Sequence, residues 1–202
     1  MKALVENLSD AALRGDVTAI SRILDQDPNL IQQKRDGATP LHFAALEGQD
    51  AAVELLLARG ADPNTEDDEY DNPPAGWANG KGHDSTVKLL VENGASMSPG
   101  QAAGWGFPDR LEELLKNAPE AINRLDRFCT PLHEAVIWGR TSIVIRLLQL
   151  GADPALQNGD GKTSTELALA QAKDGRTHTP LVCEQRRLEI EAECAHIADL
   201  LP

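Results

Sequence analysis

Aromatic residues, cysteines and long apolar runs are all scarce in this sequence, and each shortage excludes a class of protein. Phe, Trp and Tyr make up 3% of the 202 residues, too few for the core of a compact β-sandwich. The three cysteines, Cys129, Cys183 and Cys194, are odd in number and widely spaced. They argue against a disulfide framework or a zinc site and favour a reducing compartment. No window approaches 18 uninterrupted apolar residues, so we expect no membrane span.

Basic residues are also in short supply, with 19 Lys and Arg against 32 Asp and Glu and a net charge of −13. Such a surface repels a phosphate backbone, so we expect no nucleic-acid partner. A protein with a basic surface is easier to accommodate. The opening residues, MKALVENLSD, carry acidic side chains early and have no apolar stretch. We therefore expect no signal peptide and a cytoplasmic location.

What the sequence does contain is internal repetition. Residues 39–45, TPLHFAA, return as residues 130–136, TPLHEAV. Each copy is followed by a glycine, then by an apolar run with helical spacing, and then by Gly-Ala-Asp-Pro at 60–63 and 151–154. Threonine before the first helix, proline in its first turn and glycine after each helix predict a pair of helices per copy. Weaker copies bring the total to six pairs.

These linked positions resemble the ankyrin repeat, whose signature runs from Thr-Pro-Leu-His through a central Gly to Gly-Ala-Asp. The resemblance covers essentially the whole chain. It implies an all-α solenoid of about six helix pairs with short projecting finger loops. It also implies that His42 and His133 are structural and bond the backbone of neighbouring loops. Neither catalysis nor a cofactor or metal is expected.

The repeats divide one domain, residues 1–202, into units of about 1–35, 36–69, 70–97, 98–126, 127–160 and 161–202. A shift of 91 residues relates Thr39 to Thr130 and Gly60 to Gly151, which predicts two similar halves, 1–97 and 98–202. The stretch of sequence between successive helix pairs is much shorter where the halves join, so we expect a finger to be nearly absent there. The last unit has a lengthened connection, about 173–185, before a final helix that ends near Leu200.

In ankyrin arrays partners usually meet the concave side, which the first helices and the fingers form. Two of the candidate positions, Trp105 and Trp138, are tryptophans, which are typical of hot spots when exposed. The sequence leaves open whether they are contacts or local core. Trp77 aligns with Phe43 and is expected in the core. Carried over by register, the candidate partner-binding residues are Arg14, Leu46, Glu47, Tyr70, Lys81, Trp105, Arg127, Ile137 and Trp138.

Three functions remain open. The first is a monomeric interaction module that binds a protein partner on its concave face. The second is an acidic inhibitor or immunity-type protein for a basic enzyme, for which the acidic run at 66–71 would be a contact and not only a solvated tip. The third and weakest is a small-molecule or enzymatic site at the seam between the halves. It is weak because no nucleophile–base pair is visible, and Gly161-Lys162-Thr163 lacks the upstream glycine of a phosphate loop.

Overall fold

The computed structural model describes residues 2–174 and 193–201. In this part the secondary structure is helical, with two isolated bridges, Arg35↔Ala38 and Asp126↔Cys129. The predicted all-α stack of helix pairs is therefore confirmed. A helix over 193–200 ends at Leu200, as predicted. Most of the connection predicted at 173–185 lies outside the described residues.

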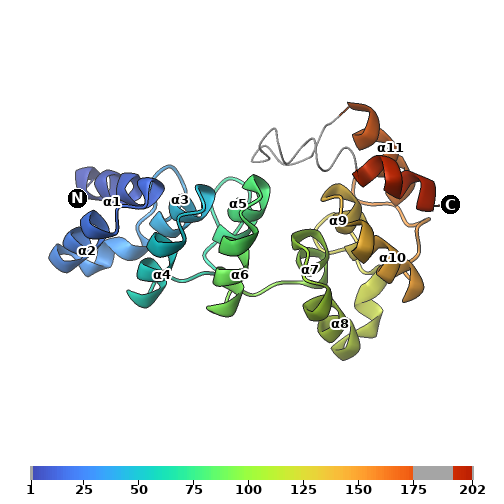
Figure 1. Cartoon of the computed structure of the whole chain (residues 1–202), viewed down its shortest axis with the longest axis horizontal. Coiled ribbons are helices and arrows are strands. Elements are labelled where there is room, and N and C mark those ends of the chain that lie inside the picture. Colours follow the sequence, from blue (N-terminus) through green and yellow to red (C-terminus); the bar gives the residue numbers. More distant parts are fainter. Residues whose placement is uncertain (1, 175–192, 202) are drawn as a thin grey trace. The chain divides into compact units, whose positions relative to one another are not determined.

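Two compact units, residues 1–96 and 97–202, divide the chain and are described separately. In unit 1 the first helices of successive pairs form an inner layer, and the second helices form an outer layer (Figure 1). The inner helices are α1 (Lys2–Arg14), α3 (Pro40–Leu46) and α5 (Pro74–Lys81). The outer helices are α2 (Val17–Gln26), α4 (Asp50–Ala58) and α6 (Asp84–Glu92), and the short 3-10 helix η1 (Pro28–Gln32) follows α2.

Unit 2 has the same order of elements. Its inner helices are α7 (Pro99–Trp105), α9 (Pro131–Ile137) and α11 (Ser164–Asp174), and α9 packs against both of the others. Its outer helices are α8 (Pro108–Asn117) and α10 (Thr141–Gln149), with the 3-10 helix η2 (Pro119–Asn123) after α8. Residues 93–98 alone join α6 to α7, whereas residues 59–73 join α4 to α5. The finger expected to be nearly absent is thus absent at this junction.

The inner helices begin where the Thr-Pro-Leu-His motif predicts. Pro131 occupies the first turn of α9, and Thr130 Oγ1 accepts from the backbone N–H of His133 at 3.4 Å. The ring of His133 bonds back to Thr130 and, through Nε2, to the carbonyl of Lys162 at 3.1 Å. A carbonyl can only accept, so Nε2 carries the proton. In α9 the capping box fixes the start of the helix, and the Nε2 bond ties the helix to the next loop.

The equivalent histidine in unit 1 makes the same contacts. His42 Nδ1 lies 2.7 Å from Thr39 Oγ1, and its Nε2 lies 3.1 Å from the carbonyl oxygen of Asn72. His42 is fully buried. Burial lowers its pKa to about 4, although the bond to Asn72 works in the opposite direction. The structural role predicted for both histidines is confirmed.

Small side chains let the two helical layers approach closely. Ala44 and Ala78 on the inner helices of unit 1 are fully buried, and so are Leu56 and Leu90 on its outer helices. Each buried leucine contributes about 2 kcal/mol of apolar burial. None of the helices in the described ranges, 2–174 and 193–201, is both long enough and apolar enough to cross a membrane.

Candidate functional site

Four loops, here called fingers, project from the inner helices: residues 33–39 and 66–72 in unit 1, and residues 124–130 and 157–162 in unit 2. Within each unit the two fingers are joined by a backbone hydrogen bond. In unit 1 the amide of Asp68 donates to the carbonyl of Gly37 at 3.0 Å. In unit 2 the amide of Gly159 donates to the carbonyl of Phe128 at 2.7 Å. Both units have this backbone hydrogen bond, so the fingers of the two units differ mainly in their side chains.

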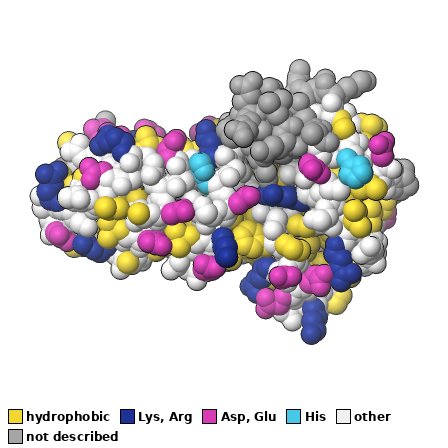
Figure 2. Space-filling model, viewed as in Figure 1, with side chains coloured by type: hydrophobic (Ala, Val, Ile, Leu, Met, Phe, Trp, Pro, Cys, Tyr) yellow, Lys and Arg dark blue, Asp and Glu magenta, His cyan; other side chains and the backbone are white. Residues whose placement is uncertain are grey.

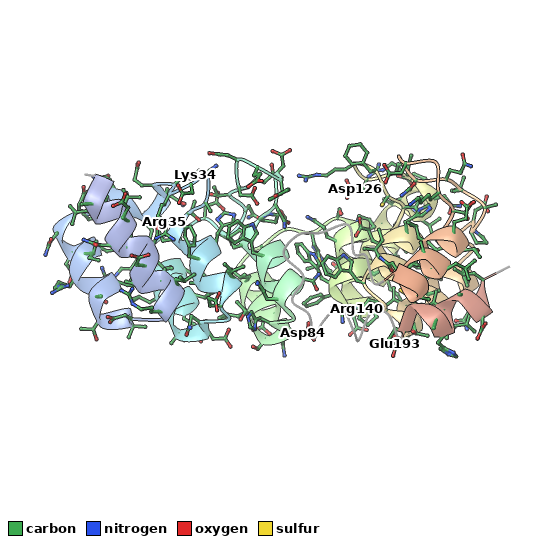
Figure 3. All side chains as sticks on the ribbon, turned by 90° about the horizontal axis from the view of Figure 1, so that it is seen from above. Lys34, Arg35, Asp84, Asp126, Arg140 and Glu193 are labelled. Atoms are coloured by element: carbon green, nitrogen blue, oxygen red, sulfur yellow. The ribbon has the colours of Figure 1, made fainter. Side chains whose placement is uncertain are left out.

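The basic side chains of the 33–39 finger interact with other residues of unit 1. Lys34 forms an ion pair with Asp68 and donates to the carbonyl of Glu66 at 2.8 Å. Arg35 forms an ion pair with Asp10 at 2.5 Å, and its guanidinium lies 4.2 Å from the centre of the Phe43 ring. In Figure 3 both labelled side chains extend from this finger. The basic groups of the finger are therefore held by internal partners.

The acidic run in the 66–72 finger is only partly available to solvent. Asp67 is 3% exposed and accepts hydrogen bonds from the indole N–H of Trp77 at 2.7 Å and from the amides of Glu69 and Tyr70. Burial alone would raise the pKa of Asp67, but these hydrogen bonds outweigh it and lower the pKa below its ordinary value. Asp67 thus holds the finger together, and Tyr70, 43% exposed, lies at its tip. Trp77 packs edge-on against Phe43 and is only partly buried, so it lies at the edge of the core, whereas the sequence predicts a position within it.

The 124–130 finger presents apolar side chains to solvent. Phe128 is 70% exposed and Leu125 is 47% exposed. The finger is closed by a hydrogen bond from the Asp126 amide to the carbonyl of Cys129 at 2.8 Å and by a reciprocal bond at 3.2 Å. A Cβ atom at Gly159 would lie 2.6 Å from Phe128 Cδ1. Glycine at 159 therefore lets the Phe128 ring rest on the neighbouring finger.

A carboxyl group lies beneath this finger, on α9. Glu134 is only partly exposed, and a Cβ atom on Gly104 of α7 would lie 3.3 Å from its Oε2. Burial raises the pKa of Glu134 to about 7; hydrogen bonding to Trp138 and Cys129 opposes this, and the negative charge of Asp126 adds to it. The Cys129 thiol is buried as well, and burial raises its pKa to about 12. Glu134 thus shares hydrogen bonds with Trp138 and with Cys129, which lies on the finger.

The nine predicted contact residues fall into three groups. Trp105, Trp138 and Ile137 are buried, at 7%, 7% and 6% exposure. The structure therefore resolves the open question about the two tryptophan rings in favour of local core. Gly104 explains the burial of Trp138, because any side chain there would meet Trp138 Cδ1 at 2.6 Å. Leu46 and Lys81 are partly exposed, and the remaining four, Arg14, Glu47, Tyr70 and Arg127, are exposed. Their roles in binding stay predictions.

Sequence reasoning missed Phe128 and Leu125, although it named Arg127 on the same finger as a candidate contact. The signal was available in the shift of 91 residues. It aligns Phe128 with Gly37 and Leu125 with Lys34. An aromatic side chain in place of a glycine on an exposed loop indicates a contact position.

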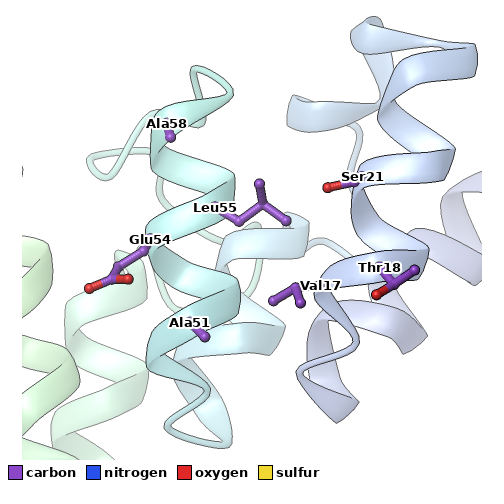
Figure 4. A pocket seen from close by; sticks show the side chains of 7 residues that line it. All are labelled: Val17, Thr18, Ser21, Ala51, Glu54, Leu55 and Ala58. Carbon is purple, nitrogen blue, oxygen red and sulfur yellow. The ribbon is translucent and has the colours of Figure 1, made fainter.

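The outer layer of unit 1 contains an open groove of about 640 Å³ between α2 and α4 (Figure 4). In unit 2 the shift of 91 residues places Glu112 and Arg146 where unit 1 has Ser21 and Leu55. Their side chains form an ion pair from Arg146 Nε to Glu112 Oε1 at 2.6 Å that crosses from α10 to α8. The groove is lined by Val17, Thr18, Ser21, Ala51, Glu54, Leu55 and Ala58.

Among the described side chains, no group of three or more His, Cys, Asp or Glu is placed to hold a metal ion. The two described cysteines, Cys129 and Cys194, are both buried. Burial raises the pKa of each thiol to about 12, so neither is a ready nucleophile.

Comparison with known proteins agrees with the repeat pattern. The family model for three copies of the ankyrin repeat matches residues 8–99, and the single-repeat model matches residues 128–159. The mitochondrial disaggregase of Bos taurus is 30% identical over 166 residues, which is 80% of this chain and 20% of that protein. Ankyrin repeat and SOCS box protein 16 of Mus musculus is 30% identical over 165 residues, or 78% of this chain and 31% of that protein. The chain thus spans less than a third of the length of these relatives.

A solved structure shares the fold. One chain of the complex between the predatory endopeptidase Bd0816 of Bdellovibrio bacteriovorus and the immunity protein Bd3460 aligns with a TM-score of 0.62 and 20% identity. The alignment covers 94% of this chain and 97% of that chain.

Proposed function

Because the chain belongs to the ankyrin-repeat family, whose repeats are protein–protein interaction modules, we propose that it binds a protein partner through its fingers and inner helices. Phe128, on the 124–130 finger, is the central contact. The observation that carries this proposal is the 70% exposure of its ring. A large aromatic ring in water is costly, and aromatic side chains anchor protein interfaces.

The residues around Phe128 support its role as the anchor of the interface. Leu125, on the same finger, adds a second apolar side chain at 47% exposure. The finger backbone is fixed by the Asp126–Cys129 bridge and by the bond from Gly159 to the Phe128 carbonyl. A contact on a fixed loop loses little conformational freedom on binding. The 124–130 finger therefore combines apolar area with a defined geometry.

Replacement of Phe128 by alanine is expected to weaken partner binding by about 30-fold or more, the usual effect of removing an aromatic hot spot. The partner would first be captured from an extract of the native cells and then measured by surface plasmon resonance. Ile145→Ala is the matched control, because Ile145 is 39% exposed on the outer helix α10. Equal affinity of Phe128→Ala and the wild type would contradict the proposal.

A second candidate is an inhibitor or immunity-type protein for a basic enzyme. Two observations favour it. The structural alignment is with a chain from an endopeptidase–immunity protein complex. Unit 1 carries 17 Asp and Glu against 8 Lys and Arg, a net charge of −9 within the total of −13. Acidic side chains are scattered over the visible face of unit 1 in Figure 2, not gathered in one patch, so the attraction would be long-range.

Association with a basic target would then slow strongly as salt is added. Raising the ionic strength from roughly 0.01 M to 0.15 M shortens the screening length from about 30 Å to about 8 Å. We expect the association rate to fall by about tenfold or more over this range, measured by stopped flow with the captured partner. An association rate that does not change with salt would exclude this candidate and leave the first one standing.

The chain is proposed to act by binding and not by catalysis. The raised pKa values of the Cys129 and Cys194 thiols and the structural bonding of His42 and His133 support this. The absence of a nucleic-acid partner, the monomeric state and the cytoplasmic location stay predictions.

A further inference from the structure

The groove between α2 and α4, on the outer layer of unit 1, is apolar at its centre. Helix α4 contributes Leu55 together with the small side chains of Ala51 and Ala58, and α2 contributes Val17 and Ser21. In Figure 4 the side chains of Leu55 and Ser21 point toward each other from the two helices. Val17 is 38% exposed and Leu55 is partly exposed. Two branched apolar side chains therefore remain in contact with water in a hollow of about 640 Å³.

An ion pair closes one end of this groove. Arg59, which follows α4, contacts Asp25 of α2 at 2.9 Å between Nη1 and Oδ1. In unit 2 the ion pair between the outer helices lies at the centre instead, where Arg146 and Glu112 stand at the positions of Leu55 and Ser21. The charged bridge that spans the outer layer of unit 2 is thus replaced in unit 1 by apolar surface.

The charge around the groove is negative. Glu54 is exposed on its α4 side, and no basic side chain lines it. The nearest cations are engaged or face elsewhere, because Arg59 is paired with Asp25 and Arg22 lines a different pocket, between α1 and α2. Unit 1 as a whole has 17 acidic and 8 basic side chains, a net charge of −9. An occupant with basic side chains complements this surface, whereas a second copy of the chain would be repelled.

The shape of the groove fits a short helix. Its α4 wall runs from Ala51 to Ala58, about 10 Å or two turns. The backbone groups of α2 and α4 bond within their own helices, so an extended peptide would find no partners for its amides here. A helix satisfies its own backbone, and its side chains pack as a ridge into the groove between two other helices. It would present one apolar side chain per turn, at positions i and i+3 or i+4.

We propose that the groove between α2 and α4 docks a short, basic amphipathic helix of a partner protein. Apolar side chains of that helix cover Val17 and Leu55, and a lysine or arginine beside them reaches Glu54. The long stem of such a side chain lies along the apolar surface while its charge stays in water. This interaction goes beyond the proposed function and does not rest on it, because every residue that lines the groove lies on an outer helix.

A synthetic peptide of about 18 residues, long enough to form a helix, serves as the probe. It has leucines along one helical face and lysines and alanines elsewhere. It would be titrated into the full chain, and the methyl signals of Val17 and Leu55 would be followed by NMR. We expect these signals to shift and to saturate. Ile145, which occupies the position of Glu54 on α10 and is 39% exposed, should not show a saturable shift. Equal shifts at Ile145 would indicate adsorption to any apolar surface and overturn the proposal.

The ion pair of unit 2 provides a variant that fills the groove. Ser21→Glu combined with Leu55→Arg reproduces Glu112 and Arg146 in unit 1 without changing the net charge. The peptide should bind this double variant about tenfold or more weakly, because an apolar contact is lost and the hollow is bridged. Val17 still reports binding, and circular dichroism would confirm that the variant is folded. Unchanged affinity in the folded double variant would overturn the proposal.

A matched pair of charge reversals separates local from overall charge. Glu54→Lys should weaken binding of the lysine peptide about fivefold or more, because an attraction at the groove becomes a repulsion. Glu120→Lys makes the same change in net charge at an exposed site of unit 2 and should alter the affinity by less than about twofold. Equal effects of the two variants would show that only the overall charge attracts the peptide, and the proposal would fail.

Two other occupants are tested in the same experiment. A peptide with glutamates in place of the lysines should bind about tenfold or more weakly. Equal binding of the two peptides would indicate an apolar occupant with no preference for charge. Shifts of Val17 and Leu55 that depend on protein concentration, with no peptide present, would identify a second copy of the chain as the occupant. Either result would overturn the assignment of a basic helix.

Discussion

Acidification from pH 7 to about pH 4.5 is expected to destabilise unit 1 by about 2–3 kcal/mol through His42 alone. The pKa of His42 is lowered to about 4 from its ordinary value of 6.5, because burial disfavours the charged ring. A group with a lowered pKa in the folded chain contributes stability above its ordinary pKa and loses it as the pH falls toward the folded value. The unfolded chain takes up the proton first, so the balance moves toward unfolding.

Hydrogen exchange of the α4 amides under native conditions would measure this loss within unit 1. His42→Gln should be less stable than wild type at pH 7, because a glutamine cannot bond Thr39 and the Asn72 carbonyl together. Its stability should also depend less on pH between 7 and 4.5. The pKa of Asp67 is lowered by its hydrogen bonds, so protonation of Asp67 destabilises unit 1 further at lower pH. Equal stability of the wild type at pH 7 and pH 4.5 would contradict the assignment.

Glu134→Gln is expected to stabilise unit 2 by about 2 kcal/mol at pH 8 and to have little effect at pH 4.5. The sign is opposite to that of His42. Burial raises the pKa of Glu134 to about 7, so its contribution is complete below the ordinary value of 4.5. That contribution is lost as the pH rises through 7. Above pH 7 the native state must hold a poorly hydrated carboxylate, and glutamine removes this cost.

Only the difference between variant and wild type isolates Glu134. His133 lies in the same unit, and burial lowers its pKa, so its contribution falls as the pH falls. This opposes the effect of Glu134 between pH 4.5 and pH 7, but it is common to both proteins. The free energy of unfolding would be taken from exchange of the α10 amides at pH 4.5 and pH 8. Glu120→Gln, at an exposed site on η2, is the control. An equal gain at both pH values would rule out a titration of Glu134.

The fold was predictable because the signals for each helix pair are local. A threonine, a proline and a histidine at fixed spacing define the capping box of α3 and again of α9. The glycines that follow, such as Gly60 with φ of 92°, take a left-handed conformation that other residues adopt at a cost. These features depend only on residues close together in the sequence, so a single sequence is sufficient to find them.

The candidate site was less predictable because it depends on contacts between successive repeats. Family register placed Trp138 at a contact position, but Gly104 on a different helix lets the ring lie inward. The acidic run was identifiable, yet the burial of Asp67 depends on Trp77, which lies ten residues further along the chain. The pKa of Glu134 is raised mainly by burial, which depends on its neighbours in the fold. Register gives the position of a side chain along the array, and its neighbours determine whether it reaches solvent.

The outer helices show how two copies of one architecture can diverge without disturbing their inner layer. In unit 1 the space between α2 and α4 is bordered by Leu55 and Ser21, whereas Arg146 and Glu112 span the equivalent space in unit 2. Apolar contacts weaken on cooling, and an exposed ion pair weakens in salt. The two halves therefore have different environmental sensitivities on their outer sides. Cooling should therefore loosen the outer layer of unit 1, and added salt should loosen the outer layer of unit 2. Neither treatment should displace the fingers.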